Sequence, residues 1–457
     1  MSCETLASQF AGVPCIGLAG LTQHVIARLV ASCEHTACCG QSTGVNHPRE
    51  TRPHDTIVPS VQSPRKVCVT GMLERLIDNL RALVPNMHEL TRELVCINSY
   101  TSHPEGVNAV GRVLERAFDL PGLQHWAERG AAERGDHLFW RTTGAAGAPL
   151  LLIGHHDTVF PPGHFEGYRV DAGRAYGPGT LDMKGGLAII WGVLKVLSDA
   201  GALPTRALVL ASVADEEMGS LDSRKHLERL AHGAQGALVF EAGRERDAII
   251  TQRRGVGTLR VVATGVAAHS GNEHQKGRNA ITSLARFVDC AQSLTDYDRG
   301  TTVNTGLISG GTSANTVPAH AEATLDLRFE HVPDAEELMN RLQRTAQRVA
   351  LEGTQLSFHG GIKRLPMARS LASVALYEVY ARAQLEAGLG AEEAPLVGGG
   401  SDGNTVSALG VPTIDGLGPR GRGFHTTDEY VELDSFGPKA EALLRFLWSE
   451  REPLVRR

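Results

Sequence analysis

Residues 149–159 of this 457-residue chain read PLLLIGHHDTV. A short apolar run bounded by turn residues, here 149–154, is typical of a strand buried in a parallel sheet. The polar residues His155, His156 and Asp157 follow it directly. Because open α/β sheets place their functional groups at the carboxyl ends of strands, this stretch predicts an α/β fold with a site beyond residue 154.

The same arrangement occurs twice more along the chain. Residues 207–213 (ALVLASV) run into the acidic residues 215–217 (DEE), and residues 237–240 (ALVF) run into Glu241. A helix predicted over residues 185–197 supplies the alternation of strands and helices that a parallel sheet needs. Three predicted strands therefore each end in a residue that could bind a metal or act as a base.

Residues 257–362 follow a different pattern. Strand-like and helical segments alternate there in the order β-α-β-β-α-β, which is the order of a ferredoxin-like domain. The expected segments are strands at 258–263, around Ile308, at 323–328 and at 355–358, and helices at 279–294 and 334–351. We therefore expect a catalytic domain in two parts, residues 72–256 and 363–457, interrupted by this inserted domain.

The first 71 residues show no such periodicity. Six of the eight cysteines lie at or before residue 68, and residues 40–66 are rich in Ser, Thr, Pro, His and Arg. We expect residues 1–71 to form a disordered extension, with folded protein from about Met72. A metal-binding Cys/His knuckle is the alternative, although the cysteine spacing contains no paired C-x-x-C motif.

Composition narrows the class of protein. Hydrophobic residues make up 42% and charged residues 21%, and the formal net charge is -6. These are values of a globular protein, and no basic stretch marks a nucleic-acid-binding surface. No apolar run is long enough to span a bilayer. Because the residues before Met72 lack the basic and apolar regions of a signal peptide, we expect the cytoplasm, with the periplasm as the alternative.

Five residues of suitable type are candidate metal ligands: His155, Asp182, Glu217, Glu241 and His425. Two histidines and three carboxylates, with no thiolate, suit a hydrolytic zinc pair with open positions better than a closed structural site. Cobalt or manganese could replace zinc at such ligands. Each residue alone has an ordinary alternative, because a lone histidine or acid is common in solvated turns. Their joint position at strand ends and in glycine-rich turns favours the metal site.

Three motifs carry a family resemblance. The patterns HxDTV at 155–159, GPGxxDxKGG at 177–186 and DEExGS at 215–220 resemble those of the zinc-dependent aminoacylase/carboxypeptidase family, and most closely its bacterial glutamate carboxypeptidase branch. The resemblance covers about residues 75–450, with the motifs in the family order. It implies a zinc-exopeptidase-like α/β/α catalytic domain carrying an inserted ferredoxin-like α+β lid, through which two copies of the chain form a homodimer.

The resemblance also implies a role for each candidate residue. Asp182 would bridge two zinc ions, with His155 and Glu241 completing one site and Glu217 and His425 the other. Asp157 would hold the free ring nitrogen of His155. Glu216 would be the general base and then the general acid, whereas His156 would be structural only.

A second set of residues is expected to bind the substrate. By resemblance, His269 in AAHSG (267–271) would reach into the partner subunit's active site and stabilise the oxyanion. Asn315 and Arg328 would hold the substrate carboxylate, for which the planar arginine fork is suited. The glycine-rich segments 398–402, which includes Ser401, and 416–423 would line the pocket.

The expected function is hydrolysis of an amide or peptide bond that releases a C-terminal amino acid, with glutamate or another acidic residue as the candidate. The basic residues Lys363 and Arg364 have two interpretations: they bind the side-chain carboxylate of the substrate, or they form a solvated pair at a domain hinge. One alternative is an N-acyl-amino-acid deacylase that uses the same two metals. Another is a metal-free family member that serves as a binding or scaffold protein. The expected partner is a small peptide or N-acyl amino acid, not a nucleic acid or a membrane.

Overall fold

The computed structural model describes residues 64–203 and 206–449. The extension predicted for residues 1–71, with most of its cysteines, therefore lies largely outside the described residues. Helix α1 (Pro64–Val95) begins before Met72, the residue from which the sequence predicts folded protein. Cys96 and Cys290 are free thiols.

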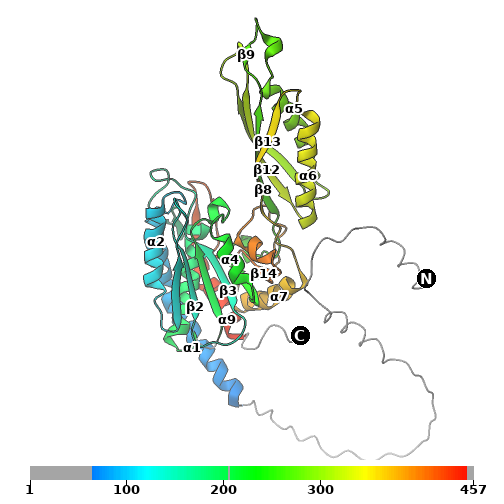
Figure 1. Cartoon of the computed structure of the whole chain (residues 1–457). Coiled ribbons are helices and arrows are strands. Elements are labelled where there is room, and N and C mark those ends of the chain that lie inside the picture. The colour runs from blue at the N-terminus through cyan, green and yellow to red at the C-terminus, as the bar shows by residue number, and fades with distance from the viewer. Residues whose placement is uncertain (1–63, 204–205, 450–457) are drawn as a thin grey trace, which may run out of the picture. The chain divides into compact units, whose positions relative to one another are not determined.

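A six-stranded sheet forms the centre of the catalytic part (Figure 1). Its strands, in spatial order, are β1 (Leu123–Glu128), β2 (His137–Thr142), β6 (Leu208–Val213), β3 (Leu150–His155), β7 (Gly236–Val239) and β14 (Thr413–Ile414). Strand β3 pairs in parallel with β6 on one side and β7 on the other. All three predicted strands are thus confirmed, and they lie next to one another.

Both faces of this sheet are buried, as the continuous apolar runs predict. Leu150 and Leu152 of β3 pack into one cluster with residues of α1, α3 (Gly185–Asp199) and α9 (Phe436–Ser449). Leu151 and Ile153 point the other way and pack with residues of α4 (Arg224–Ala231) and α8 (Asp402–Ser407). Alternate side chains of a strand face opposite sides, so helices on both faces give the predicted α/β/α architecture. Helices α2 (Pro104–Ala117) and α7 (Leu371–Glu386) complete this part.

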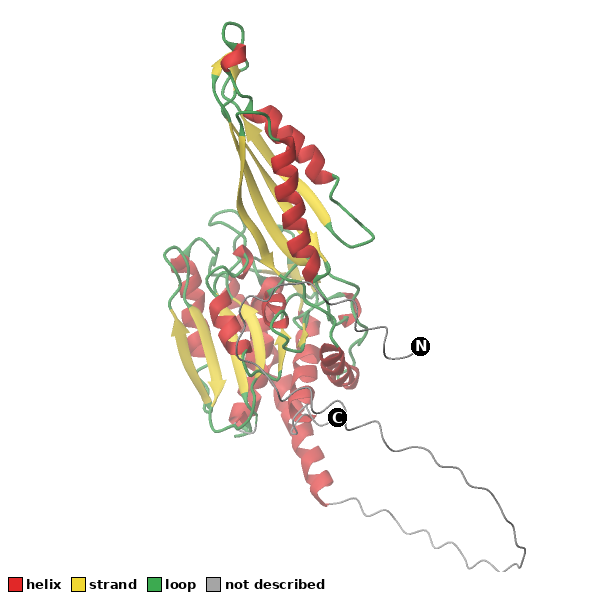
Figure 2. Cartoon of the chain, turned by 45° about the vertical axis from the view of Figure 1, so that its right-hand side comes forward, coloured by secondary structure: helices red, strands yellow, loops and turns green. Residues whose placement is uncertain are grey.

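The insert has the predicted β-α-β-β-α-β order. Its elements are β8 (Gly255–Thr264), α5 (Ala280–Gln292), β10 (Thr302–Gly310), β12 (His320–Phe329), α6 (Val332–Val349) and β13 (Gln355–Arg364). The antiparallel sheet has the order β10-β12-β8-β13, and α5 and α6 cover one of its faces (Figure 2). We call this unit the lid; its limits at 257 and 362 stay a prediction.

Two small sheets hold loops in place. Strands β9 (Ala268–His269) and β11 (Thr316–Val317) pair within the lid. In the catalytic part, a four-stranded sheet has the spatial order β15 (Gly421–Arg422), β16 (Tyr430–Glu432), β5 (Arg174–Tyr176) and β4 (Arg169–Asp171). The second sheet brings the segment before Asp182 next to the segment around His425. No helix in the described part of the chain combines the length and apolarity needed to cross a membrane.

Candidate metal centre

The parallel strands deliver three candidate ligands to one edge of the sheet. His155 is the last residue of β3. Glu217 lies in a 3-10 turn (Glu216–Met218) that follows β6, and Glu241 comes two residues after β7. Since β3 pairs in parallel with both neighbours, the three strand ends lie side by side.

His155 connects this edge to Asp182. Its Nε2 atom lies 3.3 Å from Oδ1 of Asp182 and 3.8 Å from Oε1 of Glu241. Its other ring nitrogen, Nδ1, lies 3.3 Å from Oδ1 of Asp157. The ring is almost fully buried. One nitrogen therefore faces the acidic cluster while Asp157 holds the other.

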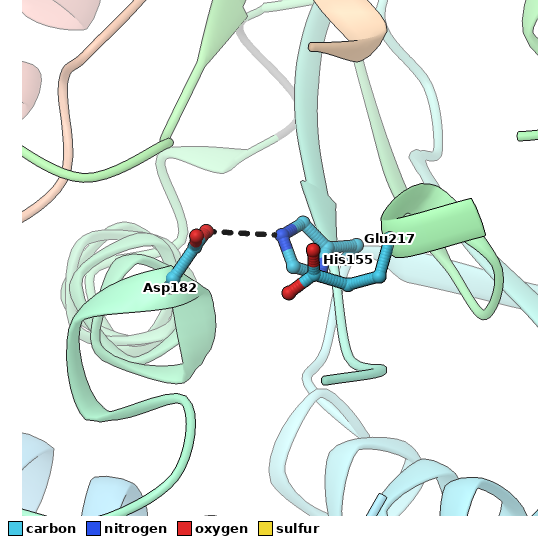
Figure 3. Close-up of side chains that lie close together, drawn as sticks. All are labelled: His155, Asp182 and Glu217. Carbon is cyan, nitrogen blue, oxygen red and sulfur yellow. Dashed lines mark hydrogen bonds and ion pairs between the residues drawn. The ribbon is translucent and has the colours of Figure 1, made fainter. Parts of the chain in front are cut away.

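Asp182 lies between two histidines. While Oδ1 faces His155, Oδ2 lies 3.3 Å from Nε2 of His425, and that same nitrogen lies 3.1 Å from Oε2 of Glu217. Figure 3 shows how the side chains of His155, Asp182 and Glu217 converge from separate elements. The structure thus brings all five predicted ligands into one cluster.

The cluster has unusual electrostatics. Burial, followed by the charge of Asp182, raises the pKa of Glu217 to about 8. The same two causes raise the pKa of Glu241 well above its ordinary value. Hydrogen bonds to Asp182 and Glu217 raise the pKa of His425 to about 11. Acids packed this closely resist ionising all at once, and a bound cation would favour their ionised forms.

The donor set fits divalent metal. Ligand atoms of His155, Asp182 and Glu217 lie within 4.8 Å of one another, and so do those of His155, Glu216 and Glu241. Imidazole nitrogens and carboxylate oxygens without a thiolate are suitable donors for zinc and similar ions. Glu216 therefore lies beside the candidate metal ligands.

Asp157 organises the turn that carries both glutamates. Its Oδ1 accepts a hydrogen bond from the Glu216 backbone N–H and its Oδ2 accepts one from the Glu217 N–H, each at 3.2 Å. The Thr101 hydroxyl donates to Oδ2 at 2.7 Å. Asp157 is fully buried, so one carboxylate fixes both the orientation of His155 and the start of the turn. His156 is also buried and contacts the Ser212 hydroxyl, as a structural residue would.

Arg364 occupies a position that the sequence did not predict. It is buried, with its side chain only 4% exposed, and its Nη1 lies 2.9 Å from Oε1 of Glu216. Its Nη2 donates to the Ser220 hydroxyl at 2.8 Å and lies 3.2 Å from Oδ1 of Asp402. The hypothesis of a solvated basic pair at a hinge is therefore wrong for Arg364, because its charge is paired inside the protein.

Glu429 is a further residue that the sequence reasoning missed. It is fully buried beneath the Asp182 loop. Its carboxylate accepts hydrogen bonds from the backbone N–H groups of Gly179, Leu181 and Asp182 at 3.1, 2.9 and 3.1 Å. The one available signal was its place four residues after His425, on the same segment.

Ser401 is used within the protein. Its hydroxyl donates to Oδ2 of Asp415 at 2.5 Å and accepts from the Gly403 N–H, which caps α8 together with Asn404. The side chain is 1% exposed. Because the hydroxyl is engaged and buried, it is not available to contact a substrate.

The predicted substrate residues of the lid divide into two places. His269 and Asn315 lie together, since Thr316 pairs with His269 and the Ser270 N–H donates to the Asn315 carbonyl at 3.0 Å. Arg328 lies at the opposite end of the lid sheet. Its fork binds both carboxylate oxygens of Asp326, at 2.7 and 2.8 Å, and its Nη1 donates to the Gly398 carbonyl. Within one chain, Asn315 and Arg328 are therefore not brought together.

His269 is also distant from the candidate metal-binding cluster of its own chain. Strand β8 runs ten residues from Gly255, where Val256 pairs with Arg364, to Thr264. At about 3.3 Å per residue this is roughly 30 Å. Because Arg364 contacts Glu216 and His269 lies past the far end of β8, the His269 ring is separated from that cluster by the length of the lid sheet.

Comparison with known proteins agrees with this geometry. Residues 151–449 match the model of peptidase family M20/M25/M40. Carboxypeptidase G2 of a Pseudomonas species is 30% identical over 407 residues, covering 84% of this chain and 94% of that protein. A succinyl-diaminopimelate desuccinylase of Alkalilimnicola ehrlichii is 28% identical over 335 residues, covering 67% and 86%.

Solved structures share the fold. A tripeptidase of Staphylococcus aureus superposes with a TM-score of 0.67 at 21% identity, covering 80% of this chain and 98% of that chain. An M20 family metallo-carboxypeptidase of Sulfolobus solfataricus does so with a TM-score of 0.64 at 18% identity, covering 79% and 98%. The predicted class of metal-dependent hydrolase is confirmed: this chain belongs to peptidase family M20/M25/M40.

Proposed function

We propose that this protein is a dizinc hydrolase that cleaves an amide bond next to a free carboxylate and releases the C-terminal amino acid. The position of Asp182 carries the proposal, because each of its two carboxylate oxygens faces a different histidine. A carboxylate placed in this way suits a bridge between two metal ions. The names of the similar proteins, a carboxypeptidase and a desuccinylase, fit an amide bond as the target.

In this proposal the five clustered residues hold the metals. His155 and Glu241 would hold one ion, Glu217 and His425 would hold the other, and Asp182 would supply a ligand to both. A metal pair held there supplies Lewis acidity, which polarises the scissile carbonyl and acidifies the attacking water. Asp157 keeps the Nε2 atom of His155 directed at the metals by holding Nδ1.

Glu216 moves the proton. Its backbone is fixed by Asp157, and its Oε1 atom is paired with Arg364. The second carboxylate oxygen is therefore left to accept a proton from the water as the water attacks the carbonyl. The same carboxyl then donates that proton to the leaving nitrogen. Glu217, the next residue, faces His425 instead and binds metal.

We also propose a homodimer formed through the lid. The distance between His269 and the metal cluster of its own chain supports action in the partner subunit's site. Strand β10 is an edge of the lid sheet, and its residues Leu307 and Ile308 are 69% and 59% exposed. Edge strands with exposed apolar side chains commonly pair with another chain. A mixture of inactive His269→Ala and Glu216→Ala chains should then regain activity, and heterodimers without activity would contradict the trans role.

A hydrolysis screen tests the function. With zinc or cobalt supplied, the enzyme should release free amino acid from N-acyl amino acids, dipeptides or folate-type glutamates. The match to desuccinylases favours an N-acyl-amino-acid deacylase as the second candidate, and preference for short acyl groups over peptides would select it. Two zinc ions per chain by elemental analysis would exclude the metal-free scaffold. The cytoplasmic location stays a prediction that cell fractionation would test.

A further inference from the structure

Arg244 lies in the loop that follows the proposed ligand Glu241. The backbone of this loop is fixed on both sides of the arginine. The Gly243 N–H donates to the Pro419 carbonyl at 2.9 Å, and the Arg244 carbonyl accepts from the Asp247 N–H at 3.1 Å. These two hydrogen bonds fix the backbone position of Arg244 beside the proposed metal-binding cluster.

The guanidinium is directed to the rim of that cluster. Its Cζ atom lies 5.9 Å from the ring centre of Phe424. The Phe424 ring in turn contacts the His425 ring edge-on, with 5.5 Å between the ring centres. Phe424 is 41% exposed and the His425 side chain 51% exposed. Arg244 is therefore separated from a proposed metal ligand by one aromatic ring, at a corner that solvent and substrate can reach.

Arg244 has no acidic partner among the described residues. Its Nε atom is buried without a hydrogen bond, and no carboxylate of residues 64–203 or 206–449 lies within ion-pair distance of it. The other arginines of residues 241–254 and 420–422 each have a carboxylate partner: Arg246 with Glu392, Arg253 with Asp415, Arg254 with Glu330, Arg420 with Asp247 and Arg422 with Glu245. Arg244 is therefore the one arginine of these two segments without a carboxylate partner among the described residues.

An unpaired cation in this position costs stability. Burial and the nearby charge of Arg253 lower the pKa of Arg244, yet a guanidinium stays protonated at any ordinary pH. Its Nε donor is thus removed from water without a hydrogen bond, and only the more distant charges of Asp415, Glu241 and Asp182 offset this cost. A bound anion would satisfy this donor, and the planar fork matches a carboxylate with two parallel hydrogen bonds.

We propose that Arg244 binds a carboxylate of the amino acid that the enzyme releases, so that the preferred substrates are anionic next to the scissile amide. This inference rests on the proposed amide-hydrolase function and names its specificity residue. Arg328 is less suited to the same task in this chain, because Asp326 already occupies its fork. The carboxylate could be the α-carboxylate or one on the side chain, and the experiment below separates the two.

The test compares wild-type zinc-loaded enzyme with Arg244→Gln and Arg244→Lys on three substrates. N-acetyl-glutamate has both carboxylates, N-acetyl-glutamine lacks the side-chain carboxylate, and N-acetyl-isoglutamine lacks the α-carboxylate. Arg246→Gln is the matched control, since Arg246 lies two residues away and its surface partner is Glu392. Zinc content and thermal melting of each variant report whether the fold and the metal site are intact.

Arg244→Gln should lower kcat/KM for N-acetyl-glutamate by about 10- to 100-fold, the loss expected for a charge-assisted hydrogen bond. It should leave one amide substrate within about threefold of wild type: N-acetyl-glutamine if Arg244 binds the side-chain carboxylate, or N-acetyl-isoglutamine if it binds the α-carboxylate. Arg244→Lys should retain part of the preference and Arg246→Gln all of it. Equal losses on all three substrates would overturn this inference alone. A wild-type enzyme indifferent to the carboxylates would overturn it together with the free-carboxylate requirement of the proposed function. If the wild-type enzyme hydrolyses none of the three, nor any substrate of the screen, the proposed function falls and this inference falls with it.

Discussion

Arg364, the last residue of β13, holds its Nη1 atom 2.9 Å from Oε1 of Glu216. One end of a lid strand is thus in direct contact with the proposed general base. The same guanidinium also contacts the Glu216 carbonyl, the Ser220 hydroxyl and Asp402. Arg364 therefore fixes both ends of the Glu216 residue, side chain and main chain, and acts as a positioning residue for it.

Two substitutions of Arg364 should distinguish the effect of its positive charge from the effect of its geometry on Glu216. Arg364→Met removes one partner of a buried ion pair and should lower the free energy of unfolding by about 3–5 kcal/mol. Arg364→Lys keeps the charge but offers a single nitrogen for four contacts. This variant should therefore be more stable than Arg364→Met, but it should lose most of kcat while KM changes little. Urea unfolding and steady-state kinetics measure the two effects. Arg369→Gln, which breaks a surface pair with Glu393, should change stability by at most about 1 kcal/mol.

Substitutions of the adjacent residues Glu216 and Glu217 should have different effects on activity and metal content. Glu216→Gln removes the proton carrier and should reduce kcat by about 10²- to 10⁴-fold while both metals stay bound. Glu217→Gln removes a group that contacts His425 and should lose metal. Zinc analysis beside kinetics distinguishes them. Glu216→Gln enzyme that retains activity within about tenfold, below the contribution of a general base, would contradict its role.

Glu429 should control metal affinity without touching metal. Its three hydrogen bonds hold the backbone around Asp182, so Glu429→Ala should weaken zinc binding by about 10- to 100-fold, as losses of supporting residues do. Competition with a chelator measures this, and the absorption spectrum of the cobalt-loaded enzyme should shift because the Asp182 geometry changes. Glu429→Gln should rescue part of the affinity. A matched control is Glu432→Gln, which breaks only the nearby pair with Arg420; an equal loss there would argue for a general effect on the segment.

The local sequence was sufficient to predict the candidate ligands that lie at the ends of strands. The runs before His155, Glu217 and Glu241 predicted three strands, and parallel pairing necessarily brings their ends together. Asp182 and His425 follow no such rule, because the small sheet of β4, β5, β15 and β16 joins segments that are distant in the sequence. Their residue types and glycine-rich surroundings made them candidates, and their assignment to individual metal sites came from the family resemblance.

The residues that escaped prediction are partners across long sequence separations. Arg364 and Glu216 are 148 residues apart, and Glu429 is 247 residues from Asp182; no local periodicity can signal such pairs. Ser401 is a different case, since a serine before a short helix, with a polar residue three positions later, is a helix N-cap signal. The glycines around it suggested a pocket lining instead.

Metal binding should release protons in a pH-dependent way. In the metal-free protein, burial and Asp182 raise the pKa of Glu217 to about 8, whereas an unfolded glutamate has a pKa of about 4.3. Glu217 is then protonated at pH 6.5 and ionised at pH 9.5, but a metal requires the carboxylate at both values. Zinc binding at pH 6.5 should therefore release more protons than at pH 9.5. Because the folded pKa is the higher one, protonation of Glu217 stabilises the metal-free fold at acidic pH, and this stability is lost as the pH rises through about 8. Calorimetric titration in two buffers of different ionisation enthalpy counts the protons, and urea unfolding with chelator present measures the stability. In the metal-free protein, Glu217→Gln should abolish the Glu217 part of the pH-dependent stability. A proton release by the wild-type protein that is the same at the two pH values would contradict the assignment.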